Sequence, residues 1–584
     1  MSRKLLLLIL VPAILLIAGY FALQVYLRAG NRKEEKELEQ TFGAAAAAEA
    51  KVDSLGGKKV SPADLRPLFV ERMKQLLMKS SNGLYDLSVG DLKVDVPAST
   101  ISLQNVTVGP DAKALENLKA SGLLPNDVFS IAFKNLVLEG VNLDDVLTSK
   151  TMDYKLIRLV NPVIEIDHRK AKESKTEGDF AQRFLKQMEK LSVNKLVVEG
   201  GSIIVHDRQK GTRKKLANVQ VLMNDILLNE ETRKDKNRFL YAKEARLDFH
   251  QYTSTTKDGL YRFKIGDVSV NASQKQITLK NLSFGSPLSK EAFVAKQKKA
   301  KEMYSLSLPS MTINGVDWWS LLNEEEVIAR EAETKGGKFT VYFDRALPPK
   351  NKMGNFPNQL LLKLPLQLNI ARLKIRDLAV SYEERNPLSQ QSGTVYLDNA
   401  SMDFTNVNNN SKTPVVVNGT ALLMHKIPVR AMFRFDMSGA KSGRFSASIQ
   451  STTPYDGRLL NTVAVPLGMM KVEKADLKKL TATIKGDENG AGGDVEVLYK
   501  DLKLTLLEKD KGKVALDKKD VTSFLANLVL KKDNPKDGKA PRQEQAQFRR
   551  DPNGGFMMLV WKTVLVGILK TIGAPEKLAY KKSK

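Results

Sequence analysis

Residues Thr100–Gly109 read TISLQNVTVG, and this stretch decides how the rest of the chain is interpreted. Apolar and polar residues alternate on both sides of Asn105, but the asparagine shifts the alternation by one position. A period of two is typical of a β-strand that buries one face. A β-bulge at the asparagine would keep the apolar residues on that face, and a tight turn there is the alternative. The apolar residues of this copy are Ile101, Leu103, Val106 and Val108.

The same pattern recurs in three further places. The later copies carry Ile131, Phe133, Leu136 and Leu138, then Ile277, Leu279, Leu282 and Phe284, and finally Leu306 and Leu308. Gly109 and Gly285, which close the first and third copies, lie 176 positions apart. Gly140 and Gly315, which close the other two, lie 175 positions apart. The chain therefore repeats a long segment and not only a short motif.

A third pair of segments extends the match. KLVVEGGSIIVHD, from Lys195, resembles RLKIRDLAVSYEE, from Arg372, at an offset of 177 positions. Three landmarks in the same order at nearly constant spacing indicate a duplicated unit of about 175 residues. We therefore predict two β-repeat units over residues 84–260 and 261–432, followed by a C-terminal β region over 433–530.

The N-terminal end predicts a membrane anchor. Leu5 to Leu27 form an uncharged run of 23 residues, which would span roughly 34 Å as a helix and so cross a bilayer core. A cleaved signal peptide is the alternative, but the apolar run is longer than such a peptide needs. Residues 1–30 are therefore predicted as a single transmembrane anchor, and because long C-terminal domains translocate largely regardless of flanking charge, we expect the body outside the cytoplasm.

Two segments join the anchor to the sheet. Residues 31–60 mix charges with an alanine run and are interpreted as a tether. Residues 61–83 open with Ser61 and Pro62 and carry apolar residues at helical spacing, which predicts a helix that caps the sheet.

The C-terminal end predicts a linker and an amphipathic helix. Residues 531–554 are polar and are interpreted as a linker. In the segment 555–584, Phe556 to Ile572 is long enough for only about 25 Å of helix, which is marginal for a bilayer. We expect an interfacial helix, or one packed over the end of the sheet, followed by a basic tail. Its polar half carries Lys562, Thr563, Gly567, Lys570 and Thr571.

The charge balance and the polar residues exclude several classes of function. The net charge is +26 and the pI is about 9.7, but the chain has no nucleic-acid recognition motif, so anionic lipid head groups are the better match. The histidines stand at least 38 positions apart in no metal-ligand spacing, and the chain has no cysteine and no nucleophile or phosphate-loop motif. We predict a protein that is not an enzyme and holds neither a metal nor a cofactor. The histidines are His168, His206, His250 and His425.

With these motifs in order, the chain resembles the AsmA-like family of bacterial envelope proteins, in its Bacteroidetes type. The resemblance rests on the anchor, on NGLYDLSVGDLKVD from Asn82, on the repeated strand pattern, on the segment from Lys195, and on IKGDENGAGGDVEVLYKDLKLTLL and DPNGGFMMLVWKTVLVGIL near the end. It implies a mainly β fold with a long, curved, repetitive antiparallel sheet that forms a hydrophobic groove, and short capping helices. It also implies an inner-membrane anchor, a periplasmic body and a role in phospholipid transport or outer-membrane maintenance.

Two hypotheses for function follow. The first is a conduit whose apolar groove carries phospholipid, with the apolar residues of the four pattern copies as the lipid-contacting candidates. The second is a scaffold or assembly factor for outer-membrane proteins, whose sheet edge pairs with client strands. The expected partners are membrane phospholipids and an outer-membrane or envelope protein, and nucleic acid is excluded.

Overall fold

The computed structural model describes residues 81–508, 517–518 and 530–580, together with Val70 and Lys74. Gaps within these ranges fall at 82, 96, 122–126, 141–150, 169–189, 209–211, 233–234, 257, 322–325 and 365. The predicted anchor, the tether and nearly all of the predicted capping helix lie outside the described residues. Among the residues that are described, no helix has both the length and the apolar character needed to cross a membrane.

The chain is mainly β, as predicted, and divides into two compact units. Unit 1 comprises residues 1–254, 265–277 and 321–324, and unit 2 comprises 255–264, 278–320 and 325–584. The division runs through strands β9 (Arg262–Asn271) and β10 (Gln276–Gly285).

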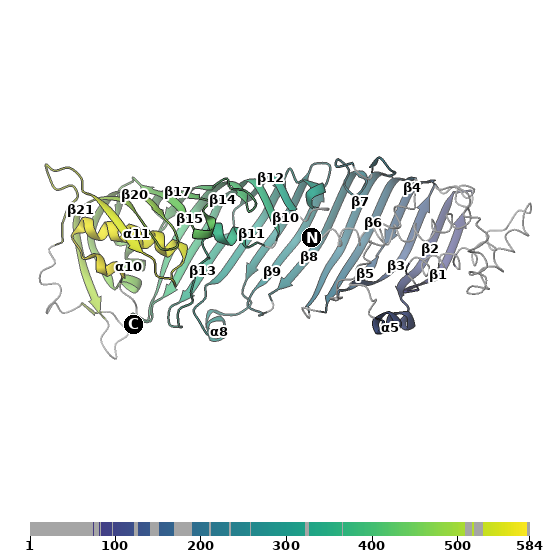
Figure 1. The fold of residues 1–584 in the computed structure, drawn as a ribbon, viewed down its shortest axis with the longest axis horizontal. Helices are drawn as coiled ribbons and strands as arrows, with labels where there is room; N and C mark the ends of the chain where they lie inside the picture. The colour runs from purple at the N-terminus through teal and green to yellow at the C-terminus, as the bar shows by residue number, and fades with distance from the viewer. Residues whose placement is uncertain are drawn as a thin grey trace, which may run out of the picture. The chain divides into compact units, whose positions relative to one another are not determined.

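Unit 1 carries a mixed sheet (Figure 1). Strands β1, β2 and β3 are antiparallel neighbours, and β3 also pairs antiparallel with both β4 and β5. Strands β4 and β5 both run parallel to β6, after which β6, β7 and β8 are again antiparallel. Its elements are β1 (Tyr85–Asp95), β2 (Thr100–Pro110), α5 (Ala112–Ala120), β3 (Asp127–Glu139), β4 (Thr151–Val160), β5 (Val163–His168), β6 (Lys190–Asp207), β7 (Thr212–Leu228) and β8 (Ala242–Thr255).

Unit 2 repeats this order and extends it. Strand β11 pairs antiparallel with β12 and β13, and both of these run parallel to β14. From β14 onward the order β15, β16, β17, β18, β20, β21 and β23 is antiparallel throughout. The strands are β11 (Met303–Asn314), β12 (Glu326–Lys335), β13 (Lys338–Asp344), β14 (Gln367–Arg385), β15 (Ser392–Asn408), β16 (Val415–Leu423), β17 (Ile427–Phe435), β18 (Phe445–Ser451), β19 (Tyr455–Asp456), β20 (Met470–Gly486), β21 (Gly490–Glu508), β22 (Asp517–Lys518) and β23 (Gln543–Arg549).

Short helices lie between the strands of unit 2 and at its C-terminal end. They are α8 (Lys290–Ala295), α9 (Pro357–Leu362), η3 (Ala440–Ser442), η4 (Gly457–Leu460), α10 (Asn461–Gly468), α11 (Phe556–Ile572) and η5 (Glu576–Tyr580). Helix α11 has the bounds expected from the sequence and packs on β21 and β23 (Figure 1).

The prediction of a purely antiparallel sheet was wrong, because four strand pairs are parallel. In each unit one long stretch breaks into two strands, at Asn161-Pro162 in unit 1 and at Gly336-Gly337 in unit 2. A connection of about twenty residues then precedes the next strand, and a connection of that length lets the chain return to the starting end and run parallel. Hydrophobic alternation carries no information on strand direction, so the sequence could not distinguish the two cases.

The two units share their residue register as well as their topology. In unit 1, Ile131 pairs with Ile164, Ile164 with Ile203, and Ile203 with Leu216. In unit 2, Leu306 pairs with Phe339, Phe339 with Val380, and Val380 with Leu397. Each of these four residues in unit 2 follows its equivalent in unit 1 by 175, 175, 177 and 181 positions respectively. Both copies therefore place equivalent residues opposite one another. The β-sheet architecture is repetitive, as the sequence pattern predicted.

The predicted change of phase is present at Asn105, but the pairing with β1 and β3 keeps one register through it, so it is not a β-bulge of two residues against one. Strand β2 continues through it, and the pairing with β1 passes from Val89↔Val106 to Asp91↔Gln104, which excludes a turn at this position. Asn105 has a φ of 47° and Asn281, its equivalent in unit 2, has 54°. Asparagine adopts this left-handed conformation more readily than most residues.

A second pair of left-handed residues recurs in the same way. Asn218 and Asp225 of β7 have φ values of 51° and 50°, and Asn399 and Asn406 of β15 have 51° and 60°. Both pairs are seven positions apart and are separated from each other by 181 positions. Because the alternation changes phase at each of these residues, long strands keep their apolar residues on one face, and the pairing shifts register at Asn218 and Asn399.

The interpretation of residues 531–554 as a linker was wrong in its central part. Gln543–Arg549 form β23, which pairs antiparallel with β21. Ala546 and Phe548 alternate with polar residues there and are buried, at 3% and 5% exposure. Asn534 is also buried, and its amide nitrogen donates to the carbonyls of Val497 and Arg542. The overall polar composition concealed a short alternation of period two.

Candidate functional site

The candidate site is one face of the unit 2 sheet, which we call the apolar face. A row of residues in direct register crosses ten strands on this face, from β11 to β23. Nearly all of these residues are apolar, so the face offers a continuous hydrocarbon surface perpendicular to the strands. The row consists of Ile313, Ala332, Leu373, Phe404, Val417, Phe433, Ala447, Ile484, Gly493 and Ala546.

The apolar face is covered at its C-terminal end. Helix α11 lies over β21 and β23, and its Phe556 ring contacts the rings of Phe433, Phe435 and Phe445 at centroid distances of 5.9, 5.3 and 4.9 Å. The buried core of unit 2 lies between this helix and the sheet. Of the two arrangements expected from the sequence, α11 therefore has the second, a helix packed over the end of the sheet.

The orientation of α11 differs from the one its sequence suggests. Thr563, Gly567 and Thr571, from the half expected to be polar, face the sheet. The two threonine hydroxyls are satisfied because they donate to the carbonyls of Leu559 and Gly567 within the helix, at 2.8 Å each. A Cβ at Gly567 would lie 2.4 Å from the Cβ of Val495. Small residues thus allow close contact with the sheet, and larger apolar side chains are left outward, including Met557 at 61% and Trp561 at 52% exposure.

The apolar face continues beyond the helix with partial exposure. A second row on the same face contains large side chains that are half-buried, neither covered like the core nor fully open. Tyr304 lies beside it, with its ring 6.3 Å from that of Phe339 and stacked on it. This row consists of Leu306, Phe339, Val380, Leu397 and Leu423.

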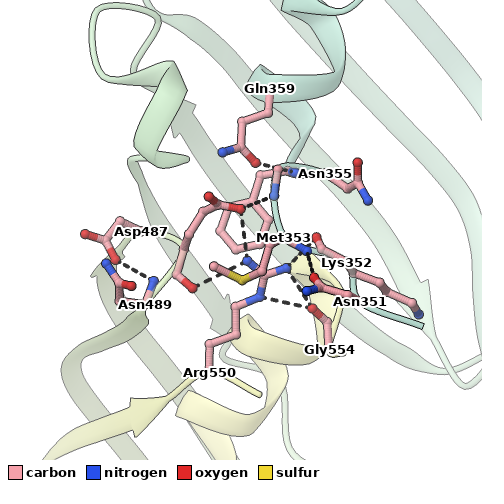
Figure 2. A network of polar contacts seen from close by, with 12 residues as sticks. Asn351, Lys352, Met353, Asn355, Gln359, Asp487, Asn489, Arg550 and Gly554 are labelled. Carbon is pink, nitrogen blue, oxygen red and sulfur yellow. Dashed lines mark hydrogen bonds and ion pairs between the residues drawn. The ribbon is translucent and has the colours of Figure 1, made fainter. Parts of the chain in front are cut away.

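A network of polar contacts fastens the tail that leads into α11 (Figure 2). The Arg550 guanidinium is 2% exposed and donates to the carbonyl oxygens of Gly554, at 2.9 and 3.0 Å, and of Lys352, at 2.8 Å. It also forms an ion pair with Glu488 at 3.3 Å and lies 4.2 Å from the centroid of the Phe356 ring. Burial lowers the pKa of the Arg550 guanidinium, and the hydrogen bond with Glu488 opposes that shift. The network holds three separate segments together at the start of the helix.

A charged cluster interrupts the apolar face at one end of β14. Val380, Tyr382 and Glu384 share this face, because alternate residues of a strand point the same way and Glu384 is in register with Phe343 of β13. The Glu384 carboxylate accepts from the Arg345 guanidinium at 3.1 Å and from the Tyr382 hydroxyl at 2.6 Å. Burial first, and then Glu384, raise the pKa of Tyr382. The carboxylate therefore has two strong partners.

The charges of this cluster also act on Lys562 of α11. Burial lowers the pKa of its ammonium, the positive charge of Arg345 lowers it further, and Glu384 opposes the shift. Beside the cluster, Lys352 forms an ion pair with Glu302 and its ammonium lies 4.4 Å from the centroid of the Phe343 ring. The cations are Arg345, Lys562 and Lys352, and the carboxylates are Glu384 and Glu302. Together these five groups carry a net charge of +1 at neutral pH.

The predicted lipid-contacting residues fall into two groups. All eight residues from the first two pattern copies are buried in unit 1, with at most 7% exposure, and are Ile101, Leu103, Val106, Val108, Ile131, Phe133, Leu136 and Leu138. In the third and fourth copies, Leu282 and Leu308 are buried at 8% and 6%, and the other four are half-buried. The half-buried residues are Ile277, Leu279, Phe284 and Leu306.

The described residues contain no group of three or more metal-ligating side chains. His250 and His425 each pair with one aspartate, Asp267 and Asp398 respectively, at 2.5 Å. His206 lies 3.7 Å from Glu165. His250 and Asp267 lie on β8 and β9, His206 and Glu165 lie on β6 and β5, and His425 lies in the turn between β16 and β17. The side chain of His168 lies outside the described part of the chain.

Sequence reasoning missed the charged cluster. A signal was present in AVSYEER, from Ala379, where the alternation that begins with Val380 and Tyr382 places Glu384 at an apolar position. Lys562 likewise interrupts FMMLVWKTVLVGIL. A charged residue at a position predicted to be apolar is a candidate site residue, because burying an unpaired charge is costly.

Comparison of the chain with protein-family models found no match, and comparison with curated proteins found no similar sequence.

Proposed function

We propose that the protein binds the acyl chains of phospholipids on its apolar face and carries them along the sheet between membranes, in support of outer-membrane maintenance. The observation that carries the proposal is the half-buried row Leu306, Phe339, Val380, Leu397 and Leu423, which continues the face beyond the helix that covers its other end. The resemblance to AsmA-like proteins favours the same function.

The chemistry of this face suits hydrocarbon. Its rows hold aliphatic and aromatic side chains in direct register, so an acyl chain lying across the strands would meet apolar groups at every step. Removing such surfaces from water stabilises the complex by about 25 cal/mol per Å² without requiring a specific polar contact. The net charge of +26 favours the anionic surface of a membrane over a neutral one.

In this proposal the chain is held at the bacterial inner membrane by Leu5–Leu27 and has its body in the periplasm. It acts by binding and not by catalysis. The resemblance to AsmA-like proteins implies that the sheet curves into a hydrophobic groove, and we include this groove in the proposal.

The second candidate function, a scaffold that pairs its sheet edge with client strands, is disfavoured at β23. The carbonyl oxygens of Gln545 and Gln547 on this strand accept from the Lys570 ammonium at 2.8 Å and from the Tyr580 hydroxyl at 3.1 Å. Side chains from α11 and η5 therefore occupy edge acceptors that an added strand would need.

Photo-crosslinking in the intact chain tests the proposal. A p-benzoylphenylalanine at Leu306, half-buried on the apolar face, is compared with one at the adjacent Ser307, which is exposed on the opposite face. After irradiation in cells and purification under denaturing conditions, mass spectrometry should find phospholipid adducts at position 306 and few at 307. Equal adducts at both positions, or none at 306, would refute the lipid-binding face.

A further inference from the structure

We infer that four exposed leucines, in α9 and in the segment after it, form a docking surface for an anionic lipid bilayer. The inference goes beyond the proposed function, because it concerns the surface of a whole membrane and residues outside the rows of the apolar face. The four residues stand at alternate positions of the sequence, and we call them the leucine surface. They are Leu360, Leu362, Leu364 and Leu366.

The first observation is that α9 buries polar side chains and turns its leucines outward. Asn358 and Gln359 are 1% and 5% exposed, whereas Leu360 is 49% exposed and the other three residues of the leucine surface are 41% exposed. Single exposed apolar residues are ordinary, but a group of large ones is typical of an interaction site. Four leucines within seven positions therefore indicate a surface that a partner covers.

Hydrogen bonds at both ends hold the leucines in this orientation. The Asn358 amide donates to two backbone carbonyls at 3.2 Å each, and the Gln359 amide donates to a third at 3.0 Å. At the other end, the Asn409 amide donates to the Leu366 carbonyl at 2.8 Å. Turning α9 over to bury Leu360 would break the first set of bonds and leave buried amides unsatisfied, which is costly. The leucines are thus exposed because polar contacts fix the backbone.

The start of α11 lies against the same segment and adds exposed apolar side chains. The Lys352 N–H donates to the Pro552 carbonyl at 2.8 Å. The ring of Phe356, which precedes α9, lies 5.3 Å from the ring of Phe556, the first residue of α11. With the leucine surface, the exposed residues on these two segments make up eight of the fourteen large apolar residues that are exposed in the described part of the chain. The additional four are Met353, Met557, Met558 and Trp561.

The charge around the leucine surface identifies the partner. Between Asp344 and Asp377 the sequence contains seven basic residues and no acidic one. Lys350 and Lys363, before and after α9, are exposed, and within the described residues neither forms an ion pair. The Lys363 ammonium donates to two uncharged oxygens, so its charge is retained. Apolar side chains flanked by such lysines suit the boundary between the head groups and the acyl chains of an anionic bilayer.

A second copy of the chain is a poorer partner for the same reason. In a symmetric dimer the leucine surface of one copy would face that of the other, and the flanking lysines would meet like charges. The net charge of +26 adds to this repulsion. An anionic membrane attracts the same groups, and we assign the leucine surface to it.

The test uses the absence of cysteine from the chain, which makes one introduced cysteine a unique site for a thiol-reactive dye. Leu362→Cys, on the leucine surface, and Ser307→Cys, exposed on β11, are each labelled with an environment-sensitive fluorophore in the full chain, held in phosphatidylcholine nanodiscs. Vesicles of equal parts phosphatidylcholine and phosphatidylglycerol, with a spin-labelled lipid as quencher, are then added. We expect quenching at position 362 and none at 307, and about tenfold weaker binding to vesicles of phosphatidylcholine alone.

Two pairs of substitutions separate the leucine surface from exposed leucines in general. Leu360→Ser with Leu364→Ser should weaken binding to the anionic vesicles about tenfold or more, because two large apolar groups no longer enter the bilayer. Leu222→Ser with Leu388→Ser is the matched control, since these leucines are 38% and 46% exposed at other places in the chain. The control pair should leave binding unchanged. Both pairs are measured by titrating the quenching at position 362.

Every other outcome overturns the inference. Absence of quenching at 362, equal quenching at 362 and 307, or equal loss of binding in both pairs of substitutions would exclude docking through the leucine surface. Equal binding to vesicles with and without phosphatidylglycerol would overturn the assignment to an anionic membrane. A fluorescence change at 362 that follows protein concentration without vesicles would identify a second copy as the partner. The lipid adducts at position 306 test the apolar face separately, so either proposal can fail while the other stands.

Discussion

Replacing Arg550 by methionine should release α11 from the apolar face. Arg550 is the centre of the contacts in Figure 2, with its side chain 2% exposed and hydrogen bonds to the carbonyl oxygens of Gly554, Lys352 and Glu488 besides the ion pair with the Glu488 carboxylate. Methionine fills a similar volume but removes the donor to these carbonyls and the positive charge beside the Glu488 carboxylate, which keeps, among the described residues, only the Gly354 N–H. Removing one partner of a buried ion pair costs about 3–5 kcal/mol, because the other charge stays buried and unpaired.

Hydrogen exchange of the peptide 556–572 in the full chain measures this effect locally. A loss of that size corresponds to a fall in protection on the order of 10²- to 10³-fold, since each 1.4 kcal/mol is a factor of ten. Arg550→Lys should lie between the two, because a lysine keeps the charge but cannot reach Gly554, Lys352 and Glu488 at once. Arg549→Met is the matched control, since Arg549 is the preceding residue and is exposed.

A double-mutant cycle separates the ion pair from the carbonyl contacts. Arg550→Met combined with Glu488→Gln should cost less than the sum of the two single variants, because the double variant leaves no unpaired charge. If Arg550→Met lowered the protection of α11 no more than Arg549→Met, the network would not hold the helix in place and the reasoning would be refuted.

Two further predictions concern the backbone and the helix contact. Asn105→Val and Asn281→Val should each lower stability by about 1–2 kcal/mol, because a valine is forced into a left-handed conformation, whereas Asn105→Gly and Asn281→Gly should cost less. Thermal unfolding measures this, and equal melting of the valine and glycine variants would count against the left-handed backbone conformation as the cause. Gly567→Leu should overpack the contact with Val495 by about 1–3 kcal/mol and speed trypsin cleavage of the tail. Adding Val495→Ala should recover part of the loss, and no recovery would place the strain elsewhere.

The charged cluster illustrates how far the sequence reaches toward a site. Glu384 and Lys562 are 178 positions apart, and each can be noticed alone as a charge at a position expected to be apolar. Nothing in either segment indicates that the two charges act on each other, because that depends on which face α11 turns toward the sheet. That choice follows from packing: Gly567 and the two threonines allow a closer approach than the bulkier side chains do.

The sequence by itself determined the class of fold, the repeat, the change of phase at Asn105 and the bounds of α11. Each of these depends on residues that are close in the chain, where alternation, an asparagine's conformational freedom or helical spacing acts directly. Only the tertiary structure decided which strands run parallel, that Gln543–Arg549 complete the sheet, and which side of α11 is buried. These depend on contacts between distant residues, whose energies a local pattern does not contain.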